Sequence, residues 1–179
     1  FMGNEFGQFI EWRFNEGLEW FLLDYDRHRQ HLDYIKELNH IYKKESPLWK
    51  DNFGWDGFSW IDANNGEQSI ISFYRTDTET GKRTVCIINL SPVDYPVYDI
   101  GMPDYGYYEE ILSSDDIRFG GEGRVNAEKM KTVPEGMHGC EQHITLHIPP
   151  LSGILLKCTR KLKRPVPKQP KEAKAPGAP

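Results

Sequence analysis

The chain has 179 residues, 38% of them hydrophobic and 27% charged, so it is long enough to bury a core of ordinary size. Residues 1–159 contain 15 basic and 26 acidic residues, a net charge of −11, whereas residues 160–179 contain seven of the 22 basic residues. An acidic body is a poor phosphate binder, so we expect no nucleic-acid partner, and a neutral polyol is compatible with it.

Neither a membrane span nor a leader peptide is expected. The sequence has no run of about 18 apolar residues, and it does not open on a basic and then apolar stretch before a small-residue cleavage site. Its three cysteines, Cys86, Cys140 and Cys158, are odd in number and lack CxxC spacing, which favours reduced thiols over a disulfide framework. We therefore expect a cytoplasmic protein.

The first predicted elements are the end of a strand, a long loop and a helix. Residues 1–3 look like the cut end of a buried strand, and residues 3–25 mix polar and aromatic side chains without a regular period. Residues 27–45 have helical spacing, with Asp26 as a possible N-cap and Pro47 as a stop. The apolar residues at that spacing are Leu32, Ile35, Leu38, Ile41 and Tyr42.

Short strand-like runs separated by turn signals fill most of the remaining chain. Residues 77–82, with Gly81, predict a hairpin connection between two of these runs. Many short antiparallel strands without helices between them indicate a β-sandwich. The predicted strands cover residues 58–62, 69–75, 83–90, 95–100, 107–112, 143–149 and 153–159.

The residue pattern also predicts where some of the runs lie in the sandwich. Residues 85–88 are apolar on both faces, as in a central strand, whereas residues 143–148 alternate, as in a half-exposed strand. Pro96 predicts an edge strand, because proline cannot donate to a strand ladder. Residues 113–139 predict a long loop, and residues 160–179, rich in Lys, Pro and Ala, predict a disordered tail.

The histidine pairs do not predict a metal site. His143 and His147 share a strand face, but four residues of strand separate them by roughly 13 Å, which is too far to bind one ion directly. His28 and His31 lie three residues apart on the predicted helix and lack a third ligand nearby. We interpret them as surface histidines and expect no metal.

The paired acidic residues are not spaced like the carboxylates of a glycosidase. Asp115 and Asp116 are neighbours in a loop, and Glu109 and Glu110 are neighbours in a strand. Glycosidic chemistry needs two carboxyl groups about 5 to 9 Å apart across a cleft. We therefore interpret both pairs as solvated charge. The glycine-rich residues 120–123 lack the strand-to-helix context of a phosphate cradle and predict a flexible loop.

Five tryptophans are candidates for stacking on the apolar faces of sugar rings, although aromatic residues more often belong to a core. Trp49 and Trp60 lie beside apolar runs, so we expect them in the core. Trp12 lies in a polar loop, where sugar binding and packing are equally open interpretations. The other two are Trp20 and Trp55.

The start of the chain resembles a known family. Residues 1–8, Phe-Met-Gly-Asn-Glu-Phe-Gly-Gln, closely resemble the eighth strand and following loop of branching enzymes in the α-amylase superfamily. The resemblance to the bacterial glycogen branching enzymes covers residues 1–158 in order. Further matching pieces are Glu11-Trp12, Leu18-Glu19-Trp20, Leu22-Leu23-Asp24-Tyr25, Phe58-Ser59-Trp60-Ile61-Asp62, Tyr108-Glu109-Glu110-Ile111-Leu112 and Ile148-Pro149-Pro150-Leu151.

The resemblance implies a mainly β fold class with three parts. Residues 1–45 correspond to the end of a catalytic (β/α)8 barrel, with its last strand, loop and helix. Residues 46–159 correspond to an antiparallel all-β sandwich of the α-amylase C-terminal type, and residues 160–179 form a tail that matches nothing in the family. Because a lone final strand and helix expose the faces that they should bury, we predict poor order of residues 1–45 in isolation.

The resemblance also implies retaining transglycosylation in glycogen biosynthesis, in which a glucan 6-hydroxyl takes a cleaved α-1,4-glucan to form an α-1,6 branch. No cofactor is needed. The family's catalytic carboxylates lie on barrel strands four, five and seven, so we assign no catalytic residue here. The implied partners are an α-1,4-glucan and the rest of the barrel, without nucleic acid or membrane. Candidates for sugar binding or for bracing neighbouring loops, with bracing slightly favoured, are Asn4, Glu5, Gln8, Trp12 and Trp20.

Two alternative functions remain open at this point. One is a stand-alone glucan-binding β-sandwich module that uses its tryptophans as a platform. The other is the C-terminal part of an amylase or debranching enzyme, which hydrolyses glucans rather than transferring them. Glycogen binding by the isolated chain would favour the first alternative, and analysis of the products distinguishes the second.

Overall fold

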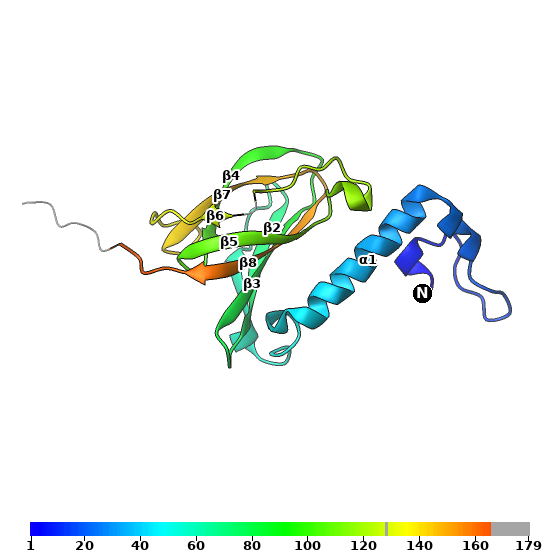
Figure 1. The fold of residues 1–179 in the computed structure, drawn as a ribbon, viewed down its shortest axis with the longest axis horizontal. Coiled ribbons are helices and arrows are strands. Elements are labelled where there is room, and N and C mark those ends of the chain that lie inside the picture. Colours follow the sequence, from blue (N-terminus) through cyan, green and yellow to red (C-terminus); the bar gives the residue numbers. More distant parts are fainter. Residues whose placement is uncertain (128, 166–179) are drawn as a thin grey trace, which may run out of the picture.

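A computed structural model of the chain describes residues 1–127 and 129–165. Among these residues, one long helix, α1 (Asp26–Lys44), stands beside a body of antiparallel strands (Figure 1). The strands are β1 Phe58–Asp62, β2 Ile70–Asp77, β3 Lys82–Asn89, β4 Tyr95–Met102, β5 Gly106–Ser113, β6 Met130–Lys131, β7 Gln142–Ile148 and β8 Gly153–Lys161. Short 3-10 turns are η1 Asn4–Phe6, η2 Trp20–Asp24, η3 Ser46–Leu48, η4 Trp55–Gly57 and η5 Ile117–Phe119.

The predicted helix is confirmed, but its N-cap is not. Asp26 is the first helical residue, and Tyr25 occupies the N-cap position without a side-chain hydrogen bond. Asp26 instead forms an ion pair with Arg29 in the first turn. The helix ends at Lys44, and Pro47 lies in the 3-10 turn that follows, as expected of a residue that cannot continue a helix.

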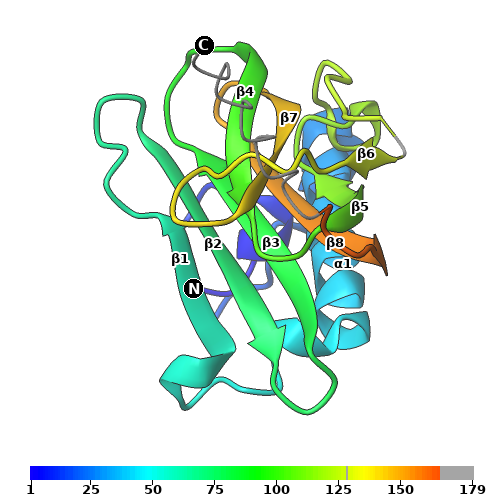
Figure 2. The same cartoon turned by 90° about the vertical axis from the view of Figure 1, so that its left-hand side faces the viewer.

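The strands form two antiparallel sheets. One has six strands in the order β1-β2-β3-β8-β5-β6, and the other pairs β4 with β7. Figure 2 shows β4 and β7 lying across the larger sheet, with α1 on the opposite side. All seven predicted strands are therefore confirmed, and the sandwich is antiparallel and mainly β as expected. Strand β6 was not predicted, because two residues are too few to show a period.

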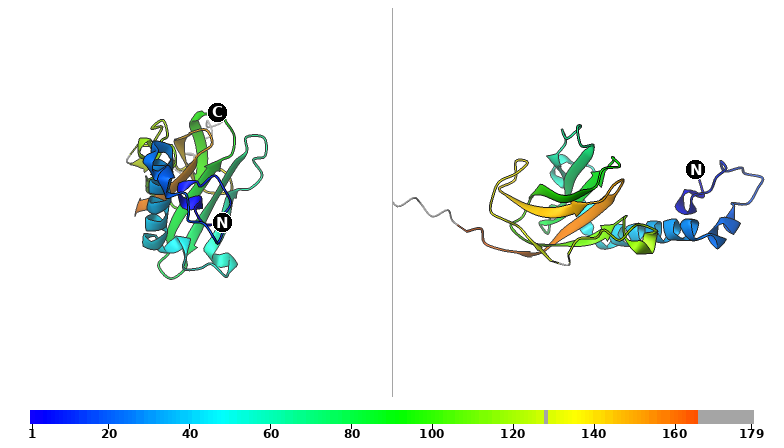
Figure 3. Two further views of the ribbon diagram at one scale, coloured as in Figure 1. Left: turned by 90° about the vertical axis from the view of Figure 1, so that its right-hand side faces the viewer. Right: turned by 90° about the horizontal axis from the view of Figure 1, so that it is seen from above.

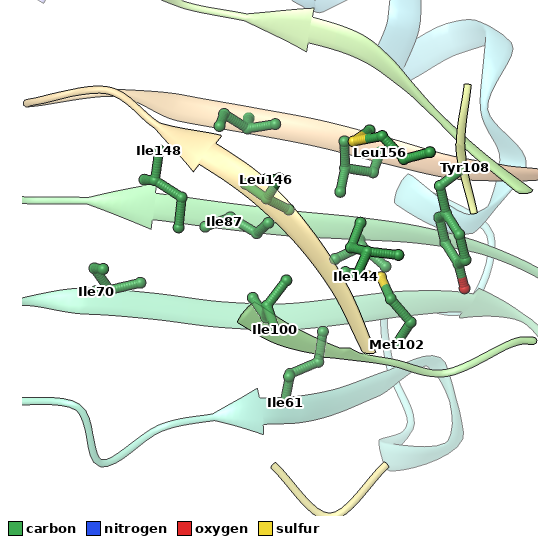
Figure 4. Close-up of a cluster of buried hydrophobic side chains, with 13 residues drawn as sticks. Ile61, Ile70, Ile87, Ile100, Met102, Tyr108, Ile144, Leu146, Ile148 and Leu156 are labelled. Atoms are coloured by element: carbon green, nitrogen blue, oxygen red, sulfur yellow. The ribbon is translucent and has the colours of Figure 1, made fainter. Parts of the chain in front are cut away.

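The core lies between the two sheets and is made by alternate residues of each strand (Figure 4). Isoleucines and leucines dominate it, and Tyr108 is the largest side chain in it that is fully buried. Its main members, drawn in Figure 4, are Ile61, Ile70, Ile87, Ile100, Met102, Tyr108, Ile144, Leu146, Ile148 and Leu156.

The places predicted for the strands are largely confirmed. Strand β3 lies between β2 and β8, and its residues Val85 and Ile87 are completely buried. Strand β4 pairs with β7 alone, and its ladder is irregular around Pro96, as expected for an edge strand. Strand β7 alternates as predicted, except that His143 is also buried, with its Nδ1 2.9 Å from the Glu135 carbonyl oxygen.

Two predicted boundaries differ from the structure. The expected loop 113–139 contains η5 and β6. The expected tail begins at Arg160, but Arg160 and Lys161 still pair with β5 opposite Tyr107 and Gly106, so β8 continues into the predicted disordered region. Residues 166–179, to which most of the prediction of disorder applies, lie outside the described residues.

Helix α1 projects beyond the sandwich and carries the N-terminal segment at its far end (Figure 3). Only Ile41 of its 19 residues is buried. Its middle contacts the η5 loop, where the rings of Tyr34 and Phe119 lie 5.3 Å apart. In the part of the chain that the structure describes, no helix is both long enough and apolar enough to cross a membrane.

Candidate functional site

The N-terminal segment, residues 1–25, contains all five residues that were singled out from the sequence. Its first turn, η1, is held on α1 by two histidines: His28 Nδ1 lies 2.7 Å from the Phe6 carbonyl oxygen, and His31 Nε2 lies 2.9 Å from that of Asn4. The interpretation of these histidines as plain surface residues was therefore incomplete. Their spacing of three residues on one helix face was the available signal.

Glycines on both sides of η1 permit this turn. Gly3 and Gly7 have φ values of +86° and +70°. These values lie in the left-handed region, which residues other than glycine rarely adopt. A Cβ on Gly3 would also lie only 2.8 Å from Gln8 Cβ. The segment therefore folds back on itself only with glycine at this position.

Gln8 ties the two ends of the N-terminal loop together. Its Oε1 accepts a hydrogen bond of 3.0 Å from the backbone N–H of Glu19, and its Nε2 donates one of 3.0 Å to the Ile10 carbonyl. The Glu19 carboxylate in turn accepts a hydrogen bond of 3.0 Å from the Phe9 N–H. Both ends of the Gln8 amide are thus engaged in bracing the loop.

The other four candidates have fewer polar contacts. Trp20 packs on Phe6 with ring centroids 4.9 Å apart, yet 56% of it remains exposed. Trp12 is 40% exposed. Asn4 is exposed and Glu5 is half-buried, and neither side chain forms a hydrogen bond with any residue that the structure describes. Asn4, Glu5, Trp12 and Trp20 are therefore available to further partners.

Large apolar side chains are unusually exposed along the N-terminal segment. Isolated exposed apolar residues are normal on a surface, whereas a large contiguous patch of them marks an interaction site. Here they follow one another within 25 residues of sequence. They include Phe1, Phe9, Phe14, Trp20, Phe21 and Tyr25, which range from 56% to 88% exposed.

The expectation that Trp49 and Trp60 belong to the core is wrong. They are 42% and 54% exposed. Trp60 lies on edge strand β1 next to the buried Ile61, so its ring faces away from the core. There it packs edge-to-face with Phe58 and Phe73, at centroid distances of 4.9 and 6.0 Å. Successive side chains of a strand point to opposite faces of the sheet. The apolar residues next to Trp60 in the sequence therefore do not indicate which face of the sheet is covered.

The outer face of the large sheet meets α1 at an apolar groove. The groove has a volume of about 450 Å³, and Tyr42 of α1 and Phe73 and Leu155 of the sheet are among its lining residues. Together with Phe58 and Trp60, these side chains leave a largely apolar surface on the side of the sheet that carries the helix.

Two of the acidic residues interpreted as solvated charge are structural instead. Asp115 accepts a hydrogen bond of 3.0 Å from the Arg124 N–H, and Glu110 accepts one of 2.7 Å from Asn126 Nδ2. Burial raises the pKa of Glu110, while the hydrogen bonds from Asn126 lower it. These contacts order the loop between β5 and β6.

The described part of the chain contains no cluster of three or more His, Cys, Asp or Glu side chains that could hold a metal ion. His147 Nε2 lies 2.6 Å from Asp94 Oδ1, whereas the His143 ring meets a backbone carbonyl, so the two rings have separate partners. The three cysteines are free thiols, and burial raises the pKa of Cys86 to about 12.

The two antiparallel sheets and their shared core define an all-β sandwich domain preceded by a helical segment. The sequence profile described as "Alpha amylase, C-terminal all-beta domain" matches residues 60–159. The chain belongs to this family.

The chain is also similar to longer bacterial proteins. It is 47% identical over 158 residues to the 1,4-alpha-glucan branching enzyme GlgB of Francisella philomiragia subsp. philomiragia. It is 45% identical over 158 residues to the protein of the same name from Francisella tularensis subsp. novicida. Each match covers 88% of this chain but 25% of the relative, so the chain spans about a quarter of the length of these relatives.

Proposed function

We propose that this chain is the carboxy-terminal part of a 1,4-α-glucan branching enzyme that acts in bacterial glycogen synthesis in the cytoplasm. The observation that carries the proposal is the identity of 47% over 158 residues to a branching enzyme. The family profile covers residues 60–159 alone, so this match extends well beyond the sandwich. Sandwiches of this family also occur in amylases, so the sandwich alone does not indicate branching activity. The similarity outside the sandwich is therefore the stronger support for a branching enzyme.

The proposed reaction is a retaining transglycosylation. An α-1,4-glucan is cleaved to a covalent glycosyl-enzyme, and a 6-hydroxyl of a glucan attacks it to form the α-1,6 branch. The reacting carboxylates of a barrel enzyme sit at the carboxyl ends of several strands. We assign none of these roles to a residue of this chain, and the proposed reaction requires no cofactor.

The proposed division has three parts, with residues 1–45 as the end of a barrel, residues 46–159 as its sandwich and residues 160–179 as a tail. The exposure of the first part supports it. Helix α1 buries only Ile41, although a helix that covers a barrel normally buries a whole stripe. The remaining barrel strands and helices would cover the exposed aromatic residues of the N-terminal segment.

Within the proposed enzyme, the N-terminal segment forms the loop after the last barrel strand. Gln8 braces this loop, and both polar atoms of its amide already form hydrogen bonds within the loop. Asn4 and Glu5 are better placed to hydrogen-bond a sugar hydroxyl or a neighbouring barrel loop. Trp12 and Trp20 supply flat surfaces for the same purpose.

A stand-alone glucan-binding module is the alternative function. The similarity to branching enzymes does not favour it, but the exposed tryptophans are compatible with it. Trp55 is 89% exposed and Trp60 is 54% exposed, as a sugar-stacking platform requires. Sedimentation with insoluble α-glucan separates the two candidates, because a stand-alone module binds the glucan as an isolated chain. Loss of that binding in Trp55→Ala, with retention in Phe53→Ala, would support the module.

The main proposal is tested by mixing the chain with a separately produced amino-terminal three quarters of the Francisella philomiragia relative. We expect the two parts to co-purify and to lower the iodine colour of amylose without a proportional release of reducing sugar. Neither part alone should do so. A mixture that releases reducing sugar in proportion to the loss of colour would instead indicate a hydrolase.

A further inference from the structure

Strands β3 and β8 separate at one end of the large sheet. Their ladder runs from Ile88 opposite Gly153 to Thr84 opposite Lys157 and ends there, while β8 goes on to pair with β5. A cavity of about 660 Å³ lies where the strands part, closed on one side by the end of α1. Its volume falls in the range of small-molecule sites, roughly 300 to 1,000 Å³.

The lining of this cavity is strongly basic, although the body of the protein is acidic. Five cationic side chains line it, and one carboxylate does. They come from three elements that are distant in sequence, so the cluster exists only in the folded chain. The basic residues are Lys44, Lys82, Arg83, Lys157 and Lys161, and the acidic one is Glu45.

Ion pairs neutralise only part of this charge. Arg83 Nη1 and Lys161 Nζ contact the same oxygen of Asp104, at 2.7 and 2.9 Å. Lys157 Nζ lies 3.1 Å from Glu45 Oε1. Two carboxylates thus face five cations, which leaves an excess of three positive charges within one cavity.

Lys44 and Lys82 supply most of the uncompensated charge. Neither forms a salt bridge with any residue among 1–127 and 129–165. The cavity also has neutral hydrogen-bonding groups, the hydroxyls of Thr80 and Thr159. Burial raises the pKa of Cys158, so its thiol stays neutral and does not reduce the positive charge.

We propose that this cavity binds a phosphorylated sugar, with the phosphate between Lys44, Lys82 and the Arg83–Lys161 pair. A phosphate group carries about −1.5 to −2 charges at neutral pH, which the excess positive charge of the cavity is sufficient to neutralise. The space exceeds what one phosphate fills, and the threonine hydroxyls suit the sugar. The net charge of −11 carried by residues 1–159 disfavours long polyanions such as nucleic acid.

The test is calorimetric titration of the full chain with glucose 6-phosphate, inorganic phosphate and glucose. We expect saturable binding of glucose 6-phosphate, weaker binding of phosphate and none of glucose. The double substitution Lys44→Ala and Lys82→Ala should weaken glucose 6-phosphate binding about tenfold, as expected for the loss of two unpaired charges at the ligand.

The matched control is Lys36→Ala with Lys131→Ala, which removes the same charge from the same kinds of element away from the cavity. It should change the dissociation constant less than about twofold, because distant surface charges are screened by salt. Unchanged thermal unfolding of both variants confirms their fold. The proposal is overturned by an absence of saturable binding, by equal weakening in the two double variants, or by phosphate binding as tightly as the sugar phosphate.

Discussion

The hydroxyl of Ser46 donates a hydrogen bond of 2.6 Å to Asp77 Oδ2 and thereby joins the helical segment to the β2–β3 hairpin. The other oxygen of Asp77 accepts hydrogen bonds from the backbone N–H groups of Glu79 and Thr80, at 3.1 and 3.2 Å. Only 1% of Asp77 is exposed. One carboxylate therefore both shapes the hairpin turn and anchors the end of the helix to the sandwich.

The Ser46–Asp77 bond predicts a specific loss of stability in acid. The pKa of Asp77 is lowered, first by the Ser46 hydrogen bond and against the effect of burial. A carboxylate whose pKa is lowered by folding stabilises the folded state at pH values above its pKa in the unfolded chain, which is about 4. This stabilisation is lost as the pH falls below that value. We expect Ser46→Ala to lower Tm at pH 7 and to flatten the fall of Tm between about pH 5 and pH 2.

The matched control for that experiment is Ser59→Ala, on the half-exposed part of β1. Its Tm should follow the pH dependence of the unmodified chain. If Ser46→Ala and the unmodified chain lose Tm in parallel on acidification, the Ser46–Asp77 bond does not set the acid sensitivity.

The buried hydroxyl of Tyr108 should stabilise the sandwich through the backbone of Asp104. It accepts a hydrogen bond of 3.0 Å from the Asp104 N–H and donates one of 3.2 Å to the Asp104 carbonyl. Tyr108→Phe leaves both groups buried without this partner, so we expect a loss of about 1–3 kcal/mol in the free energy of unfolding. Urea titration measures it, and Tyr107→Phe on the same strand should change little.

Glu110 should destabilise the fold when it ionises. Burial raises its pKa, so the stability linked to its neutral form is present below about pH 4 and is lost as the pH rises through the folded-state value. Glu110→Gln keeps an acceptor for Asn126 and should raise the free energy of unfolding at pH 7 but not at pH 3.5. Glu109→Gln controls for net charge, and an equal gain in both variants would contradict this account.

The N-terminal segment should be cleaved first by a protease. It rests on the far end of α1, and its aromatic side chains are exposed sites for chymotrypsin. We expect cleavage within residues 1–45 well before any cut within residues 58–161. Mass spectrometry of samples taken during the digest measures the order of the cuts. A digest that left residues 1–45 intact would show that this part is stable without a partner.

Seven of the eight described strands could be predicted from the sequence because each of them shows its period within a few residues, whereas β6 is too short to show one. Ile144, Leu146 and Ile148 alternate, and the uninterrupted apolar run around Ile87 reads as a central strand. The position of Trp60 could not be predicted in this way. Whether its face of β1 is covered depends on elements distant in sequence, such as α1, which leaves this edge of the sheet open.

The functional regions were predictable only in part. The N-terminal candidates could be located because residues 1–8 carry a recognisable motif, but the role of Gln8 depends on Glu19, eleven residues away. The basic cavity could not be predicted from the sequence. It gathers Lys44, Lys82 and Lys161 from a chain whose first 159 residues have a net charge of −11, so composition pointed away from an anion site.

The most direct test of the proposed function is a chimera in which residues 1–158 replace the corresponding carboxy-terminal quarter of the Francisella philomiragia branching enzyme. Branching is measured as loss of iodine colour together with the release of reducing sugar. We expect a folded chimera that lowers the colour without proportional release of reducing sugar, as the unmodified enzyme should. A chimera that folds, as judged by circular dichroism, yet hydrolyses amylose or leaves it unchanged would contradict the proposal.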